Sequence, residues 1–322
     1  MASPPEAPTR LADGPRDPHQ RAEGAGFEKN RMPFKVWLVR RAPIYLLLAV
    51  GAAIMLFPFY WMVITSLKTY AEANLSPPTL YPHAWQFSNY AQAFNRPPSG
   101  FGRYFLNSTY IAGVGTLLQV LVSILAAFAF ARLQFPFRNV LFVLVLGTMM
   151  VPFEAKVVPN FVLIRHLPFL GGNDWMGFGG SGLYDTYSGI ILPGIASAFG
   201  IFLLRQAFMQ IPRDLWDAAR VDGAGEWSFI WRILVPITVP TIFTVALFGF
   251  LSRWNDLLWP LVVTQTEAIR PVQVGLIMFS GDEGSLFHLM MAASTMVAAP
   301  IIVLFFFVQK RFIEGIAAFG VK

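Results

Sequence analysis

The side chains that most often carry out catalysis or bind metal are few in this chain and far apart. Cysteine is absent, and the four histidines, His19, His83, His166 and His288, are scattered, so no group has the spacing of metal ligands. We expect each histidine to lie in a loop or at the surface. No glycine is followed by lysine, which excludes a phosphate-binding GxxxxGK[ST] loop. The sequence therefore predicts a protein with no catalytic residue and no metal site.

A charged stretch, residues 212–236, stands out because it separates two long apolar segments. Pro212 is placed where a helix can begin, since its missing N–H would be unpaired there. Asp214 then falls in the first turn, where it complements the helix dipole. Gly223 is expected to end this helix, because glycine adopts the left-handed conformation of a C-terminal cap without steric cost.

The same stretch predicts a surface that another protein can dock on. Leu215, Ala218 and Ala219 are expected to share one face of the first helix. A second short helix is predicted over residues 226–234, ending before Pro236. Small alanines permit close approach, and acidic side chains can meet basic ones on a partner. The alternative is an ordinary cytoplasmic loop that lies on the membrane surface.

The composition indicates an integral membrane protein. Hydrophobic residues make up 55% of the chain and charged residues 13%, against about 25% charged in soluble domains. The net charge of +6 is modest, and the basic residues do not gather with aromatics, so a nucleic-acid partner is excluded. Residues 1–30 contain almost no large apolar side chain and are expected to be disordered in the cytoplasm. The membrane domain is expected over residues 31–322.

Six runs are long and apolar enough to cross a bilayer core of about 30 Å. The third is the weakest, because Glu154 and Lys156 interrupt it. We number the spans in chain order, at about residues 44–65, 108–131, 139–161, 187–206, 236–258 and 289–308.

The distribution of positive charge predicts the orientation of these spans. The segments on the side of the termini hold 17 of the 24 Lys and Arg residues, and such clusters stay in the cytoplasm. Both termini and the stretch 212–236 are therefore expected to be cytoplasmic. The loops on the other side, including 66–107 and 165–187, are long, which favours either a surface for a partner or plain connectors.

Four polar residues near membrane depth are candidates for a solute path or gate. Gln119 lies in the middle of span two, while Arg253, Asn255 and Asp256 follow the charge-free part of span five. Ionisable residues inside spans are costly and usually face the interior. For Arg253 and Asp256 we favour the alternative, an ion pair at the outer end of the helix.

A family resemblance rests first on the charged stretch. Asp217-Ala218-Ala219, Asp222-Gly223-Ala224, Phe229 and Pro236 resemble the EAA loop of ABC importer permeases, with Glu-Ala-Ala, Asp-Gly-Ala and a later Leu-Pro. The chain departs from this pattern at Asp217, which is shorter than Glu, and at Val235, which stands for Leu.

The resemblance extends over roughly residues 35–322 and is closest to the carbohydrate-uptake permeases, in particular the six-span, maltose-type second subunit. The further motifs are Phe105-Leu-Asn-Ser108, Phe130-Ala-Arg-Leu133, Gly200 to Gln206, Trp254-Asn-Asp256 with Trp259-Pro260, and the tail from Gln309 to Gly315 and Val321-Lys322.

The resemblance implies an all-α integral membrane protein with six transmembrane helices and a cytoplasmic coupling helix, the fold of type I ABC importer permeases. It implies a bacterial-type inner membrane and a sugar or sugar-like solute. The implied partners are a second homologous permease, two copies of an ATPase that hold ATP and Mg, an extracytoplasmic solute-binding protein and the lipid bilayer.

The resemblance also assigns roles to particular segments. The EAA residues would dock on the ATPase, and the tail residues Gly315, Gly320 and Lys322 would reach toward it. The loop 264–288, with Gln273, Val274 and Gly275, resembles the segment that enters an opened binding protein.

Three alternatives remain open at this stage. The solute could be a glycerol phosphate or another small polar molecule. The chain could instead be a secondary transporter, although no span core carries an acidic residue that would serve as a proton or sodium site. It could also be a membrane scaffold with no path of its own.

Overall fold

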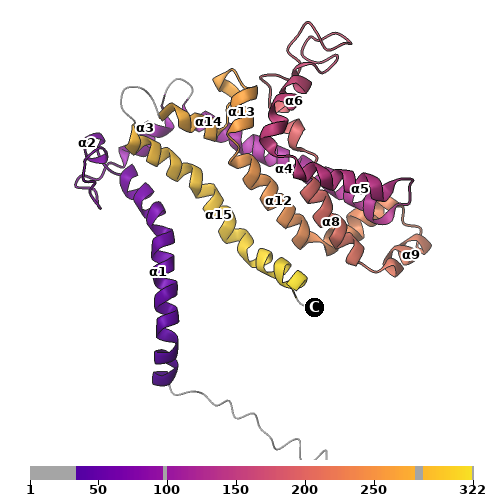
Figure 1. Ribbon diagram of the computed structural model, residues 1–322, viewed down its shortest axis with the longest axis horizontal. Coiled ribbons are helices and arrows are strands. Elements are labelled where there is room, and N and C mark those ends of the chain that lie inside the picture. Colours follow the sequence, from indigo (N-terminus) through magenta and orange to yellow (C-terminus); the bar gives the residue numbers. More distant parts are fainter. Residues whose placement is uncertain (1–33, 97–99, 280–285, 321–322) are drawn as a thin grey trace, which may run out of the picture. The chain divides into compact units, whose positions relative to one another are not determined.

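The computed structural model describes residues 34–96, 100–279 and 286–320 (Figure 1), with side chains omitted for 34–40, 278 and 307–320. Every regular element in these ranges is helical, which confirms the all-α prediction. Three helices are long and apolar enough to span a membrane, or up to six if each of three bent helix pairs counts as one span. Residues 1–30, expected to be disordered, and Lys322 lie outside the described residues.

The chain divides into two compact units, residues 1–58 and 59–322. Helix α1, Phe34–Ser66, begins in the first unit and ends in the second. Its apolar portion, Arg41–Ser66, is one of the three unbroken candidate spans, and the side chains of its most apolar window are not buried within the chain.

Helix α4, Phe101–Arg132, is the central element of the second unit, where it packs against α8, Ala198–Gln210, and α12, Val239–Trp254. Buried side chains recur along α4 every three or four residues, as at Tyr104, Ser108 and Ala112. This spacing gives α4 an inward face along its whole length. Helix α4 therefore provides the central surface against which α8 and α12 pack.

The third expected span is sharply broken. Helix α5, Arg138–Gly147, continues as the short helix η2, Thr148–Met150, and then meets α6, Phe153–Arg165, at an angle of 107°. Pro152 lies at the break, where its missing N–H cannot continue a helix. The break directly precedes Glu154 and Lys156, the charged residues that interrupt the apolar run of this span.

Two more expected spans are bent. In the fourth, α7, Tyr187–Ile191, and η3, Leu192–Gly194, are separated from α8 by a 46° bend. In the fifth, the helical stretch Glu226–Ile237 meets α12 at 84°. Both bends lie among packed neighbours, which is where irregular backbone is tolerated at membrane depth.

The remaining helices are short, apart from the last. They are α2 Tyr70–Ala73, α3 Ser88–Phe94, α9 Arg213–Val221, α10 Glu226–Phe229, η4 Ile230–Leu234, α11 Val235–Ile237, α13 Leu258–Val263, η5 Glu267–Ile269, α14 Val272–Leu276, η6 Ile277–Phe279 and α15 Phe287–Gly320.

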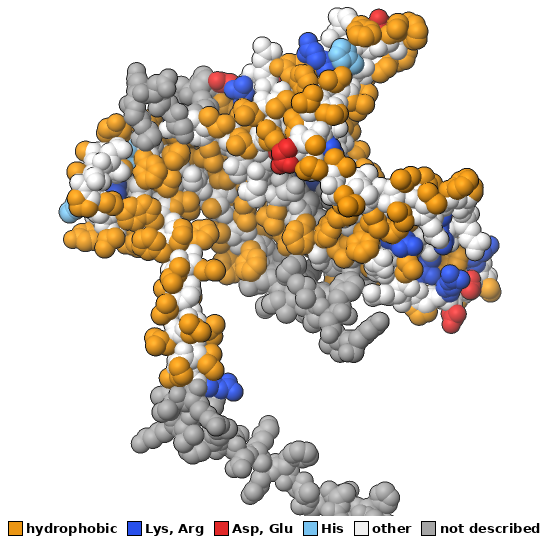
Figure 2. All heavy atoms as spheres, viewed as in Figure 1, with side chains coloured by type: hydrophobic (Ala, Val, Ile, Leu, Met, Phe, Trp, Pro, Cys, Tyr) orange, Lys and Arg blue, Asp and Glu red, His pale blue; other side chains and the backbone are white. Residues whose placement is uncertain are grey.

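The buried side chains form three apolar clusters. One joins α4 and α8 to α9 and the stretch 229–234, the second joins α3 and α4 to α15, and the third joins α4 and α6 to α7 and α13. On the face shown in Figure 2, hydrophobic side chains cover much of the surface, while Lys and Arg gather around α9. An apolar outer surface of this extent is typical of a protein that lies in lipid.

His288 corrects one prediction, because it is buried in α15 rather than placed in a loop or at the surface. The ring packs edge-on against Tyr70 with centroids 5.7 Å apart. The prediction failed because a lone histidine in an apolar sequence carries no sign of which neighbour covers it.

Candidate functional site

Helix α9 forms the first half of the charged stretch and ends as expected. Pro212 directly precedes it, and Gly223 adopts a left-handed φ of 80°. The Ala224 N–H donates to the Ala219 carbonyl at 2.8 Å, and the Gly223 N–H donates to the Arg220 carbonyl at 3.1 Å. This pair of bonds is the Schellman arrangement that stops a helix and turns the chain sharply.

One face of α9 anchors the helix to the rest of the chain. Ala219 is buried, and Trp216 packs edge-on against Phe229 with ring centroids 4.5 Å apart. Trp216 also contacts Phe128 of α4, at 6.0 Å between centroids. Phe229 is fully buried in the same cluster. The two halves of the charged stretch are thus held together by aromatic packing over the end of α4.

The opposite face of α9 is exposed and carries acidic, small and apolar side chains together. Asp217, Ala218 and Asp222 are exposed, and so are Leu215 and Val221, the latter at 88% of its surface. Of the three residues predicted to share one face, Leu215 and Ala218 are exposed, whereas Ala219 is buried. Trp216 and Ala219, at i and i+3, make the buried face instead, which leaves Leu215 free for another contact.

The second half of the stretch runs on further than predicted. Helix α10 passes into the π-helical η4 and then α11, so the helical backbone continues through Pro236 to Ile237 instead of ending before Pro236. The wider π turns directly before Pro236 change the hydrogen-bond register, which accommodates the missing N–H. An 84° bend follows between this stretch and α12.

Two arginines that lie in the family motifs at residues 130–133 and 200–206 fasten the cytoplasm-assigned end of α4, with no such role predicted for them from the sequence. Arg132, at the end of α4, donates to the carbonyl oxygens of Phe208 and Ile211, each at 2.7 Å. Arg205 donates to the Phe130 carbonyl at 3.2 Å and lies over the Phe142 ring. These bonds join the end of α4 to α8 and to Ile211, which lies between α8 and α9. The sequence signals for both were their position at the ends of charge-free runs and their place in the family motifs.

A second polar site lies among the packed helices. Arg253 of α12 donates to the side-chain oxygen of Gln119 on α4 and to the Gly194 carbonyl at the end of η3. It also donates to the Gly249 carbonyl one turn earlier in α12, at 3.1 Å. The structure therefore brings Gln119 and Arg253 together and links three spans through one guanidinium group.

Three glycines make room for this pair. A Cβ atom at Gly115 would lie 2.5 Å from Arg253 Nε, and one at Gly249 would lie 2.9 Å from Gln119 Oε1. At Gly194 the nearest guanidinium nitrogen would be 3.3 Å away. Any larger side chain at Gly115 or Gly249 would displace the pair, so the shape of the site depends on small residues from two different spans.

Asp256 and Asn255 do not join this pair, and the favoured ion pair between Arg253 and Asp256 is wrong. The Asp256 carboxylate instead accepts from the Trp259 N–H at 3.3 Å, where α13 begins. Asn255 is exposed and donates to the Leu251 carbonyl. Arg253 turns toward the spans because neutral oxygens there can accept its protons.

The opposite end of α4 holds the loop that follows α13. Asn107 donates to the carbonyls of Ala268 and Arg270, both at 2.9 Å, and accepts from the Tyr187 hydroxyl at 2.7 Å. The Val272 N–H donates to the Ser108 hydroxyl. Asn107 and Ser108 lie inside α4, which begins at Phe101, and they clamp residues 268–272.

Asp185 fastens the loop before α7 to the loop that follows α13. Its carboxylate accepts from the N–H groups of Gln265 and Thr266 at 2.8 and 3.0 Å. Burial alone would raise the pKa of Asp185, but these hydrogen bonds outweigh it and hold the pKa below its ordinary value. The loop 264–276 is therefore tied on two sides. Within it, Val274 and Gly275 are buried, Gly275 lies close against the Tyr104 ring, and the Gln273 side-chain amide donates to the Asn255 side-chain oxygen.

The backbone of the expected tail is part of α15, which continues through Gly315 and ends at Gly320. No group of three His, Cys, Asp or Glu residues able to hold a metal ion occurs in the described part of the chain. The described part of the chain therefore offers an exposed face on α9, a polar pair between spans and a clamped loop, and no group of residues that would bind a metal ion.

Known proteins resemble this chain over most of its length. Residues 119–316 match the model of a family described as "Binding-protein-dependent transport system inner membrane component". The arabinooligosaccharides transport system permease protein AraQ of Bacillus subtilis is 32% identical over 90% of this chain and 97% of its own length. The sn-glycerol-3-phosphate transport system permease protein UgpE of Yersinia pestis is 30% identical over 84% of this chain and 94% of its own.

The fold also matches a solved structure. A crystal structure of a bacterial ABC transporter involved in import of the acidic polysaccharide alginate superposes with a TM-score of 0.72 at 24% identity. The match covers 86% of this chain and 97% of that one. At this level of identity the likeness concerns the fold alone.

Proposed function

This chain belongs to the family of binding-protein-dependent transport system inner membrane components, and we propose that it imports a sugar or sugar-like solute as one of two paired permease subunits. It is a non-catalytic, multi-pass permease subunit of an ABC importer. Membership sets aside the secondary transporter and the scaffold. The solute, the partner subunits and the orientation of the termini belong to the proposal.

The observation that carries the coupling role is the division of α9 into two faces. Trp216 and Ala219 hold the helix to its own subunit, while Asp217 and Val221 remain exposed. An apolar side chain as exposed as Val221 beside carboxylates suits a cleft on a partner that is apolar inside and basic at its rim. We assign that partner as an ATPase subunit that holds ATP and Mg, with one ATPase for each of the two permeases.

Movement of the ATPase would reach the spans through packed elements. A force on α9 passes through Trp216 and Phe229 to the end of α4, and Arg132 fastens this end to α8. The 84° bend between residues 226–237 and α12 is the natural place for rotation, since hinges absorb angle changes at element ends. Closure of the ATPase dimer would thereby switch the permease pair between inward and outward states. The EAA residues of this role are Asp217, Ala218, Ala219, Asp222, Gly223, Ala224, Phe229 and Pro236.

The solute path is proposed to pass by the pair of Gln119 and Arg253. Arg253 is bound to three neutral oxygens and to no carboxylate among the described residues. A cation in this position can hydrogen-bond sugar hydroxyl groups or attract an acidic group on the solute. Asn255 and Asp256 lie at the outer end of the same helix, where they would form part of the entrance.

The outer loops are proposed to receive the solute-binding protein. Residues 264–276 are clamped by Asn107, Ser108 and Asp185, and a rigid loop docks with less loss of entropy than a mobile one. The continuation with Asp282 and Glu283 lies outside the described residues. The tail is proposed to approach the ATPase through Gly315 and Gly320. Both termini are assigned to the cytoplasm from the positive charge on that side.

The choice of a sugar rests on similarity to the arabinooligosaccharide permease, and the resemblance to the glycerol-phosphate permease keeps that solute class as the second candidate. The test is to co-purify the complex with its binding protein and screen both classes for thermal stabilisation of the binding protein and for stimulated ATP hydrolysis. Stimulation by a sugar supports the proposal. Stimulation by glycerol phosphates alone, or ATP hydrolysis insensitive to every solute, would contradict it.

A further inference from the structure

Residues 67–87, between α1 and α3, fold back along the last turns of α1. The Tyr60 hydroxyl donates to the Leu80 carbonyl at 2.7 Å, although Tyr60 lies about 9 Å before the end of α1, at about 1.5 Å per residue. The Gln86 N–H donates to the Leu67 carbonyl at 2.8 Å, one residue beyond the helix. These two bonds set the depth of the segment: Leu80 lies level with the outer turns of a membrane span, and Gln86 lies level with its end.

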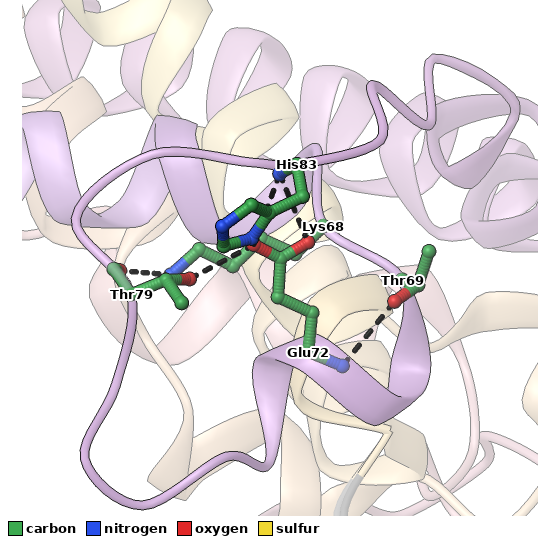
Figure 3. Close-up of polar contacts among 5 residues, drawn as sticks. All are labelled: Lys68, Thr69, Glu72, Thr79 and His83. Carbon is green, nitrogen blue, oxygen red and sulfur yellow. Dashed lines mark hydrogen bonds and ion pairs between the residues drawn. The ribbon is translucent and has the colours of Figure 1, made fainter.

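The charged groups of this segment point inward. Figure 3 shows Glu72 and Lys68 turned toward Thr79 and His83 of the same segment. Only 7% of the Glu72 surface and 1% of the Lys68 surface is exposed. The Glu72 carboxylate accepts from the Thr79 hydroxyl, the His83 N–H and the His83 ring, while Lys68 donates to the Thr79 carbonyl. Lys68 also lies over the Trp61 ring of α1, 4.6 Å from its centroid. The segment thus satisfies its charges within itself.

The outer surface of the same segment is apolar and aromatic. Tyr81, Trp85 and Phe87 are 64%, 56% and 68% exposed. The Trp85 and Phe87 rings stack nearly parallel, at 15° and 6.2 Å between centroids. Leu80 is also exposed. A loop that faces water exposes its charged groups and covers its aromatic rings, whereas this segment buries Glu72 and Lys68 and exposes its aromatic rings. Large aromatic rings are enriched where a bilayer meets water.

We propose that residues 70–87 lie in the outer headgroup layer of the bilayer, with Leu80, Tyr81, Trp85 and Phe87 in contact with lipid. The surface they form continues the exposed apolar side of α1, where Phe59 and Tyr60 are uncovered at the same depth. A Trp or Tyr ring placed there keeps its polar edge at the headgroups and its body among the acyl chains. The segment acts as a collar that fixes how deeply the outer end of α1 sits.

The absence of cysteine from the chain makes a direct test possible. Single variants Tyr81→Cys and Trp85→Cys are spin-labelled in the assembled transporter, with cysteines removed from the partner chains, in nanodiscs of phosphatidylethanolamine and phosphatidylglycerol. Collision with oxygen, which concentrates in lipid, is compared with collision with a water-soluble nickel chelate. Ser181→Cys, in the exposed outer loop, is the water-facing control.

We expect the ratio of oxygen to nickel collisions at positions 81 and 85 to be shifted well above the ratio at position 181. A ratio equal to that at 181 would mean that the segment faces water, and low collision with both reagents would mean that a protein partner covers it; either result overturns the proposal. Leu80→Cys replaces Trp85→Cys if that variant does not assemble. The measurement requires no transported solute and is independent of the solute assignment.

Discussion

Residues 212–236 and residues 67–87 are both polar connections next to apolar helices, but they distribute charge in opposite ways. The first exposes Asp217 and Asp222 and buries Phe229. The second buries Glu72 and Lys68 and exposes Trp85. Residues 212–236 resemble a helix pair of a soluble protein that leaves the apolar side chain of Val221 exposed, which fits a protein partner in water. The second is built like a surface that lies against lipid.

The difference shows that a count of charges does not identify the surroundings of a loop. Both connections contain acidic and basic residues. What separates them is whether side chains or water satisfy the charges, and this depends on contacts such as the one between Glu72 and His83 that sequence position does not reveal. The four substitutions below test the contrast, from the largest expected effect on stability to the smallest.

Phe229→Ala should lower the free energy of unfolding by about 3–5 kcal/mol, because it empties a fully buried aromatic site. The measurement is thermal unfolding of the purified complex. Trp227→Ala is the matched control, an exposed aromatic two residues away that packs edge-on against Trp231, and should cost at most about 1.5 kcal/mol. Equal losses in the two variants would mean that the charged stretch is not anchored by the cluster that contains Trp216.

Glu72→Gln should destabilise the outer segment by about 1.5–3 kcal/mol at neutral pH, because hydrogen bonds to a charged acceptor are lost beside Lys68. Burial favours the neutral acid, but bonds from His83 and Thr79 outweigh it and lower the pKa of Glu72 below its ordinary value near 4.5. Because the pKa of Glu72 is lower in the folded state than in the unfolded state, the ionised carboxylate stabilises the fold at pH values above its unfolded-state pKa. This stabilisation disappears as the pH falls through the folded-state pKa.

Unfolding of the wild-type complex between neutral pH and about pH 3 should therefore show an acid-side loss of stability that Glu72→Gln reduces, while the part contributed by Asp185 remains. Glu154→Gln, at an exposed position on α6, is the control and should retain the loss. The same acid profile in wild type and Glu72→Gln would show that this carboxylate does not hold the segment together.

Gly223→Val should cost about 1–2 kcal/mol, because a side chain branched at Cβ is strained at the left-handed φ of 80°. No neighbouring atom lies within 4 Å of a Cβ there, so the strain is purely conformational. Gly223→Asn, which tolerates this region, should retain most of the ATP-dependent uptake that Gly223→Val loses. If the two variants behave alike, the Schellman turn is not what shapes the docking surface.

Val221→Ser should change stability by less than about 0.5 kcal/mol, since the side chain is almost fully exposed. It should nevertheless weaken association of the permease with the ATPase, as measured by co-purification. Val158→Ser, exposed on α6, is the matched control and should leave association unchanged.

Much of this architecture was predictable from hydrophobic runs and the turn chemistry at Gly223. The bends were not, because a run such as 187–206 records that residues are apolar and not that Gly194 ends one helix. The role of Asn107 was missed because its partners, Ala268 and Arg270, are more than 160 positions away. The direction of the Arg253 side chain depends likewise on Gly115 and Gly194, which lie on other spans. Local patterns specify helices, whereas sites between helices arise from packing.

The most direct test of the account is the accessibility of α9 in the assembled transporter. Val221→Cys is treated with a maleimide in nanodiscs, with and without the ATPase subunits, and Ser181→Cys is treated alongside. The account predicts that the ATPase protects position 221 from modification and leaves position 181 unaffected. Equal modification of position 221 in the presence and absence of a bound ATPase would contradict it.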